Sequence, residues 1–147
     1  ALKNIDSILK LIEDENLPVE TIVIGRSDLS QSLMIPDVDN EKMLKICIEI
    51  LSKKRNLNVT LGGNLMSKSF SFIRNLSQKG LYSFESRKCT FKTKLSLEKN
   101  DFNSLINSAL EFELSWLNCK KNLYGDRSQE ENLRIKTIES RLKNSIL

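Results

Sequence analysis

Apolar residues along the chain follow two patterns, one typical of amphipathic helices and one typical of buried strands. Leu2, Ile5 and Ile8 recur at helical spacing, and this first stripe ends before Pro18. Between the first two helical stripes lies a β-branched run, Thr21-Ile22-Val23-Ile24, closed by Gly25, as in a parallel strand buried on both faces. The pattern predicts helices at about residues 2–12, 40–55, 66–76, 101–123 and 129–147, and strands at Thr21–Ile24, Asn58–Leu61 and Leu81–Phe84, the last extending to Phe91 at most.

The predicted strands alternate with single helices, which implies a parallel sheet with right-handed crossovers. In such a sheet, ligands bind beyond the carboxyl ends of the strands. We therefore expect Asp28, Gly62 and Glu85, which follow the three strands, to lie together at one edge of the sheet. The segments concerned are Gly25-Arg26-Ser27-Asp28, Gly62-Gly63-Asn64 and Glu85-Ser86-Arg87-Lys88.

Composition predicts one domain without a nucleic-acid or membrane partner. The 147 residues, 39% of them hydrophobic, suffice for a single core. The formal charge is +4, but the basic residues are spread among 19 acids and form no stripe, which argues against nucleic-acid binding. Cys47, Cys89 and Cys119 lack metal-site or disulfide-framework spacing. No apolar run would span a membrane and no secretory signal opens the chain, so we expect a cytoplasmic protein.

Two of the strand-end segments carry candidate chemistry, and each also has a structural interpretation. The position of Asp28 favours two roles equally. It is either a ligand for a hard divalent cation or the N-cap of a short helical turn at residues 29–33. Gly62-Gly63 either brings backbone N–H groups close to an anion or forms a turn. Spacing alone leaves both alternatives open.

Several motifs together resemble one family. The stretch Ile22-Val23-Ile24-Gly25-Arg26-Ser27-Asp28-Leu29-Ser30 resembles the strand and metal loop of the aldolase/citrate lyase family. That family comprises phosphoenolpyruvate-binding barrels and includes hydroxy-oxo acid aldolases and citryl-CoA lyase subunits. Val59-Thr60-Leu61-Gly62-Gly63 is similar to the next strand, and Leu81-Tyr82-Ser83-Phe84-Glu85-Ser86-Arg87-Lys88 to the last strand of one branch. In that branch, a Phe-Glu-Thr-Arg-Lys run precedes a helix like Ala109-Leu110-Glu111-Phe112-Glu113-Leu114.

The resemblance implies that residues 1–147 are a partial domain, the C-terminal part of a (β/α)₈ TIM barrel, in which three parallel strands alternate with helices and C-terminal helices follow. A whole barrel typically needs about 250 residues. By this resemblance, the metal-binding glutamate would lie just upstream of Ala1-Leu2, and the general base and the carboxylate-binding arginine on earlier strands.

The resemblance also implies an activity. The full-length protein would be a metal-dependent carbon–carbon lyase for a hydroxy-oxo acid or acyl-CoA, and a homo-oligomer, in which Mg²⁺ or Mn²⁺ stabilises the enolate. Asp28 matches the metal-binding aspartate, although we expect no metal on this chain alone. Substrate contacts are expected at Arg26, Ser30, Gly62, Gly63, Glu85 and Arg87.

One departure favours a rival interpretation. After Asp28-Leu29-Ser30 the family often has a glycine, whereas this chain continues as Gln31-Ser32-Leu33-Met34-Ile35. The alternative is a non-catalytic α/β binding or scaffold domain derived from the same barrel. Arg87 and Lys88 either reach an anionic substrate or form a strand-end cation paired with Glu85.

Three strands of a barrel leave unpaired strand edges and an uncovered inner face, because closure of the barrel is what removes edges in such folds. We therefore expect Ile22, Ile24, Val59 and Leu61 to form an exposed apolar surface unless a partner chain covers it.

Overall fold

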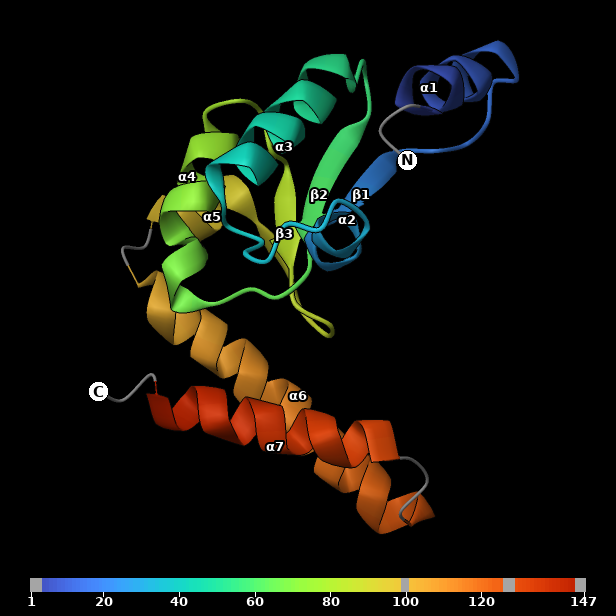
Figure 1. Cartoon of the computed structure of the whole chain (residues 1–147). Coiled ribbons are helices and arrows are strands. Elements are labelled where there is room, and N and C mark those ends of the chain that lie inside the picture. The colour runs from blue at the N-terminus through green and yellow to red at the C-terminus, as the bar shows by residue number, and fades with distance from the viewer. Residues whose placement is uncertain (1–3, 99–100, 126–128, 145–147) are drawn as a thin grey trace.

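The computed structural model describes residues 4–98, 101–125 and 129–144 (Figure 1). Helices and short strands alternate through the first two thirds of the chain, and two long helices follow. In chain order the elements are α1 (Ile5–Asp14), β1 (Thr21–Gly25), α2 (Arg26–Ser32), α3 (Glu41–Lys53), β2 (Asn58–Gly62), the 3₁₀ helix η2 (Ser67–Ser69), α4 (Phe70–Ser77), β3 (Ser83–Glu85), β4 (Thr90–Lys92), α5 (Thr93–Glu98), α6 (Phe102–Tyr124) and α7 (Gln129–Asn144).

The sheet has the order β1-β2-β3-β4, with the first three strands parallel. Ile24 pairs with Leu61 and Leu61 with Phe84, so the carboxyl ends of the three strands lie at one edge. The predicted α/β class and the three parallel strands are therefore confirmed.

The third strand is shorter than predicted and turns back as a hairpin. The Ser86 N–H donates to the Cys89 carbonyl at 2.8 Å, and the Ser86 hydroxyl accepts from the Cys89 N–H at 3.1 Å. A serine hydroxyl that bonds the nearby backbone in this way favours a tight turn. The chain then returns as β4, antiparallel to β3, with Phe84 opposite Phe91.

Most predicted helices are confirmed, and side-chain caps define two of their beginnings. The Asn40 side chain accepts from the Lys42 N–H at the start of α3, and the Asp101 carboxylate accepts from the Ser104 N–H at the start of α6. The predicted helix at 66–76 begins as the short 3₁₀ turn η2. Ser128, the first residue of the expected capping box, lies outside the described residues, as do Ala1 and Leu2.

The predicted exposed apolar surface is wrong, because the residues concerned face the core. Val59 and Leu61 are fully buried, Ile24 is 5% exposed, and Ile22 packs half-buried against the same cluster. Helices α3 and α4 supply the opposing side chains of this cluster, including Met43, Cys47, Phe72 and Ile73. Neighbouring side chains of a strand point to opposite faces, so Val23, Thr60 and Ser83 share the other face. On that face Val23 is 57% exposed, whereas Thr60 and Ser83 are buried.

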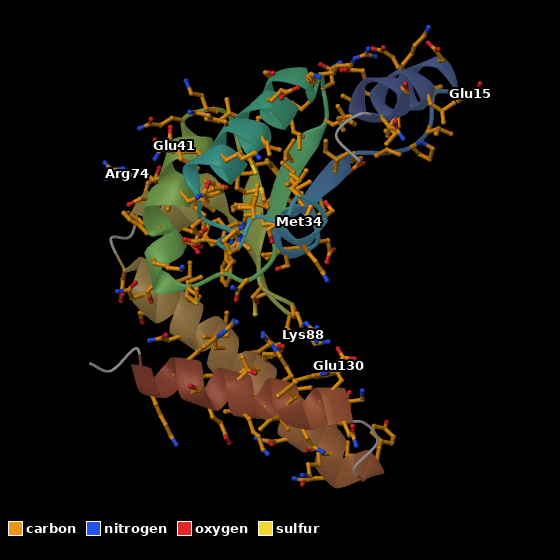
Figure 2. The ribbon with its side chains drawn as sticks, in the orientation of Figure 1. Glu15, Met34, Glu41, Arg74, Lys88 and Glu130 are labelled. Atoms are coloured by element: carbon orange, nitrogen blue, oxygen red, sulfur yellow. The ribbon has the colours of Figure 1, made fainter. Side chains whose placement is uncertain are left out.

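Helices α6 and α7 pack against each other as a hairpin beyond the carboxyl ends of the strands (Figure 1). Ile138 of α7 is fully buried, and Ile106, Leu110 and Leu117 of α6 are nearly so. Figure 2 shows Lys88, from the β3–β4 turn, and Glu130, from the start of α7, where the sheet meets this hairpin. Among the described residues, every helix is too short or too polar to cross a membrane.

Candidate functional site

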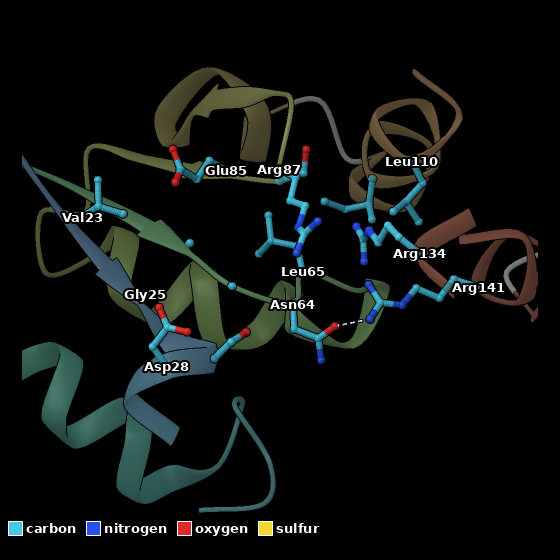
Figure 3. A pocket seen from close by; sticks show the side chains of 15 residues that line it. Val23, Gly25, Asp28, Asn64, Leu65, Glu85, Arg87, Leu110, Arg134 and Arg141 are labelled. Atoms are coloured by element: carbon cyan, nitrogen blue, oxygen red, sulfur yellow. Dashed lines mark hydrogen bonds between the residues drawn. The ribbon is translucent and has the colours of Figure 1, made fainter. Parts of the chain in front are cut away.

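A cavity of about 630 Å³ lies at the carboxyl ends of β1, β2 and β3 (Figure 3). Its size falls within the roughly 300–1,000 Å³ typical of small-molecule sites. Asp28, Gly62 and Glu85 all line it, so their predicted clustering is confirmed. Helix α7 contributes Arg134 and Arg141, so the cavity lies between the sheet and the helical hairpin.

Asp28 and Glu85 form an acidic side of the cavity, and two glycines make room for them. A Cβ on Gly25 would lie 3.3 Å from the Asp28 Oδ2, and a Cβ on Gly62 would lie 3.2 Å from the Glu85 Oε1. Because Gly25 and Gly62 are register partners, the two carboxylates lie over neighbouring positions of the sheet. Larger side chains at these glycines would fill the space beside the carboxylates.

Asp28 does not lie on a loop, as the sequence pattern suggested, because β1 runs directly into α2. Gly25 occupies the N-cap position, and Asp28 belongs to the first turn of the helix. Asp28 is therefore not the N-cap residue either. Its side chain is exposed.

Gly63 is needed for close packing of the backbone. Its φ of +89° lies in the left-handed region, and a Cβ there would stand 2.6 Å from the Ser27 amide nitrogen and 3.0 Å from that of Arg26. Any larger residue would push the β2–η2 loop away from the N-terminus of α2. This geometry favours the turn interpretation of Gly63, because the protein backbone itself occupies the space beside those amides.

Arg26 is fully buried and holds the two loops together. Its Nε donates to the Gly62 carbonyl at 3.3 Å, its Nη2 donates to the Gly63 carbonyl at 2.6 Å, and its Nη1 forms an ion pair with Asp39. Burial lowers the pKa of the guanidinium, and the Asp39 carboxylate opposes this effect. The guanidinium also lies over the Phe72 ring, 5.1 Å from its centroid. These contacts give Arg26 a structural role in place of the expected substrate contact.

Asp39 extends this network to the start of α4. Its second carboxylate oxygen accepts from the Ser69 hydroxyl at 2.8 Å, and that hydroxyl accepts from the Met66 N–H at 3.2 Å. Ser69 is fully buried. The chain that links Arg26 to Ser69 therefore fixes the segments after β1 and β2.

Two other predicted substrate contacts lie in different surroundings. Ser30 is 7% exposed and its hydroxyl donates to the Ser27 carbonyl at 2.8 Å, so it bonds within α2 and does not line the cavity. Arg87 lines the cavity. Its ion pair within the described residues is with Glu130 at 3.5 Å, so the expected pairing with Glu85 is wrong.

Arg87, Arg134 and Arg141 form a basic side of the cavity, opposite the carboxylates (Figure 3). Arg134 binds Glu113 in a bidentate pair, with Nε···Oε1 and Nη2···Oε2 distances of 2.8 and 2.6 Å. Glu113 is 1% exposed. Arg141 donates to the Asn64 side-chain oxygen, and its pKa is lowered by burial and then by the positive charge of Arg134.

Sequence reasoning missed Asp39, Glu113, Arg134 and Arg141. Two signals were present for the helical residues. Arg134 and Arg141 are seven residues apart, which places them on one face of a helix. Glu113 follows Leu110 by three residues and precedes Leu117 by four, so it occupies a core position of α6. Asp39 carried no comparable signal, because it lies in an irregular segment.

The acidic side offers two carboxylates for a cation. Mg²⁺ is commonly bound through one or two carboxylates, with water and substrate oxygens completing six ligands. Within the described residues, no group of three or more His, Cys, Asp or Glu side chains could hold a metal ion. A cation at these carboxylates would therefore need its other ligands from water, from substrate or from another segment.

No model of a known protein family, no curated protein and no solved structure matches this chain. The family resemblance of the strand-end motifs therefore stays a prediction, and the functional argument rests on the residues of the cavity.

Proposed function

We propose that this chain forms the C-terminal part of a (β/α)₈ barrel whose full-length protein is a metal-dependent carbon–carbon lyase, with Asp28 as a ligand of Mg²⁺ or Mn²⁺. One observation carries the proposal. The Asp28 and Glu85 carboxylates lie over paired glycines at the carboxyl edge of a parallel sheet, in a cavity of substrate size. In sheets of this kind, that edge is where ligands bind.

The residues of the cavity would have separate roles. Asp28 would hold the cation, and Glu85 would accept a hydrogen bond from a water or hydroxyl group beside it. A divalent cation bound there would polarise the oxygens of an oxo acid and stabilise the negative charge that develops as a carbon–carbon bond breaks. Because Gly25 and Gly62 have no side chain, the Asp28 and Glu85 carboxylates lie directly beside the strand ends.

The rival function is a non-catalytic binding or scaffold domain. Its support is that no third metal-binding side chain joins Asp28 and Glu85 among the described residues. In a lyase, the remaining ligands and the general base would come from other strands, substrate and water. The two functions therefore differ in whether the full-length protein binds a divalent cation at Asp28.

The test is Mn²⁺ binding by the full-length protein, measured by electron paramagnetic resonance, together with divalent-dependent release of pyruvate or a related oxo acid. We expect Asp28→Asn to weaken Mn²⁺ binding by more than roughly 10–100-fold, the usual cost of losing a group that only hydrogen-bonds to a metal ligand. It should also abolish turnover and leave thermal stability nearly unchanged. The matched control is Asp14→Asn, which removes an exposed carboxylate at the end of α1. Wild-type metal binding and turnover in the Asp28 variant would favour the scaffold domain.

A further inference from the structure

One face of α6 carries a stripe of apolar side chains that the described part of the chain leaves exposed. Phe112, Trp116 and Leu123 are 53%, 51% and 70% exposed, and Cys119 is exposed between them. Their spacings are four, three and four residues, so the four side chains follow one face of the helix over about 16 Å. Single exposed apolar residues are common, but a continuous stripe marks an interaction surface.

Helix α7 does not cover this stripe, because it is held on the adjacent face of α6. Arg134 of α7 binds the buried Glu113 of α6 in a bidentate pair, which fixes that packing. Lys88, from the β3–β4 turn, lies over the Trp116 ring, 5.4 Å from its centroid. Half of the Trp116 side chain is still exposed, so the stripe has room for a further partner.

The spacing of the stripe indicates which partner would cover it. Alternating steps of three and four residues are those of a coiled-coil seam, which packs against another helix. The order four, three, four is the same when read from either end of the helix. A second copy of α6 that runs antiparallel therefore meets the stripe in register, with Phe112 against Leu123 and Trp116 against Cys119 of the other copy. Contacts of this reciprocal kind are those of a two-fold dimer.

The charges beside the stripe also permit contact with a second copy. By helical geometry, the flanking residues on the side away from α7 are exposed and uncharged: Ser108, Ser115 and Asn122. On the side toward α7, basic and acidic side chains share one hollow of about 290 Å³, among them Lys88, Lys120, Glu130 and Glu131. Flanks of a single sign would repel their own copy and select a partner of opposite charge.

Glu111 is the remaining exposed charge near the stripe, and it lies toward one end. In the antiparallel register, the two copies of this residue are about 20 Å apart along the helices. Salt screens charges at that separation, so they oppose association little.

We propose that the exposed stripe of α6 is the interface of a homodimer, in which α6 helices of two copies pack antiparallel about a two-fold axis. This surface lies outside the residues assigned to the lyase and does not depend on that function. The seam would cover Phe112, Trp116, Cys119 and Leu123 in both copies at once.

The size of the stripe predicts a weak and reversible dimer. A fully covered aromatic side chain buries about 150–250 Å², so the exposed parts of Phe112, Trp116 and Leu123 offer roughly 300–400 Å² per copy. Stable complexes bury about 800 Å² per partner, and transient ones less than about 600 Å². With its polar flanks the stripe falls in the transient class, and we expect dissociation in the micromolar range.

The experiment is sedimentation equilibrium of the chain across micromolar concentrations, with fluorescence recorded on the same samples. Trp116 is the single tryptophan of the sequence, so its emission reports directly on the stripe. The variants Phe112→Glu and Leu123→Glu each place a charge in the seam, and circular dichroism verifies that they fold. The matched control is Leu11→Glu, at an exposed leucine of α1, which lies at the other end of the molecule from α6 (Figure 1).

We expect a monomer–dimer equilibrium, with Trp116 emission moving to shorter wavelength as the dimer forms. Each seam variant should weaken dimerisation about tenfold or more, because association would bury an unpaired carboxylate in each copy. Leu11→Glu should dimerise as the wild type does.

Three results would overturn the proposal. The first is a chain that stays monomeric throughout the series, and the second is a dimer that the seam variants leave unchanged or that Leu11→Glu weakens equally. The third is a full-length protein whose Trp116 emission lies at short wavelength while its mass is that of a monomer, since another segment would then cover the stripe. The measurement needs neither metal nor turnover, so its failure would leave the lyase proposal standing.

Discussion

Removal of the Asp39 carboxylate should strongly destabilise the protein, because it leaves the Arg26 guanidinium buried without its counter-ion. The Arg26 side chain is 0% exposed and that of Asp39 is 9% exposed, so water cannot replace the lost contact without rearrangement. Breaking a buried pair by removing one partner typically costs about 3–5 kcal/mol. Ser69 would also lose its acceptor. We therefore expect Asp39→Ala to lower the melting temperature by roughly 10 °C.

The assay is urea unfolding followed by circular dichroism, with Asp37→Ala as the matched control. Asp37 lies two residues away, and its carboxylate pairs with Lys68 and accepts from the Asp39 N–H at 3.2 Å, both at the surface. Solvent screens that pair, so the control should lose far less stability. A double variant, Arg26→Met with Asp39→Ala, should lose less than the sum of the single losses by about 1–3 kcal/mol. Equal losses for Asp39→Ala and Asp37→Ala, or strict additivity in the double variant, would refute the account of this network.

Two further predictions concern backbone packing and pH. Gly63→Ala should cost about 1–2 kcal/mol for its positive φ, plus a steric cost from the 2.6 Å approach to the Ser27 nitrogen. Gly80 has a similar φ of +88°, but a Cβ there would meet nothing closer than 3.6 Å. Denaturant unfolding should therefore show a smaller loss of unfolding free energy for Gly80→Ala than for Gly63→Ala. Burial raises the pKa of the Cys47 thiol from 9.0 to about 12. The unfolded chain therefore loses this proton at a lower pH than the folded chain does. Stability should therefore fall as pH rises from about 9 to 12, and Cys47→Ala should reduce that slope in unfolding measured across this range.

The first two parallel strands could be predicted because each is a short run with β-branched residues closed by a glycine, and the third because the apolar run at Leu81–Phe84 follows Gly80 and a helical stripe. The same rule could not find the hairpin after β3, since the Ser86 turn depends on hydrogen bonds to Cys89 that the apolar pattern does not encode. Helix α2 was missed for another reason. Its seven residues are too few for an apolar stripe, so a short turn was expected at its end.

Which face of the sheet packs against α3 and α4 could not be predicted either. Alternation along β1 separates Ile22 and Ile24 from Val23, but it does not say on which side the helices pack. The site was predictable only where it follows the strand ends, as Asp28 and Glu85 do. Arg134 and Arg141 reach the cavity only because α7 packs across the carboxyl edge of the sheet, and that long-range contact leaves no local pattern.

The structural network closes the N-terminus of α2 to a bound anion. Gly63 packs against the Ser27 and Arg26 amide nitrogens, so the protein itself occupies the approach to the first amides of that helix. The Gly62 and Gly63 carbonyls are in turn held by Arg26. The strand ends therefore present carboxylates to the cavity and keep their backbone donors out of it. Positive charge reaches the cavity chiefly from Arg87 and from α7. Packing of the helical hairpin therefore decides whether basic side chains lie opposite the Asp28 and Glu85 carboxylates.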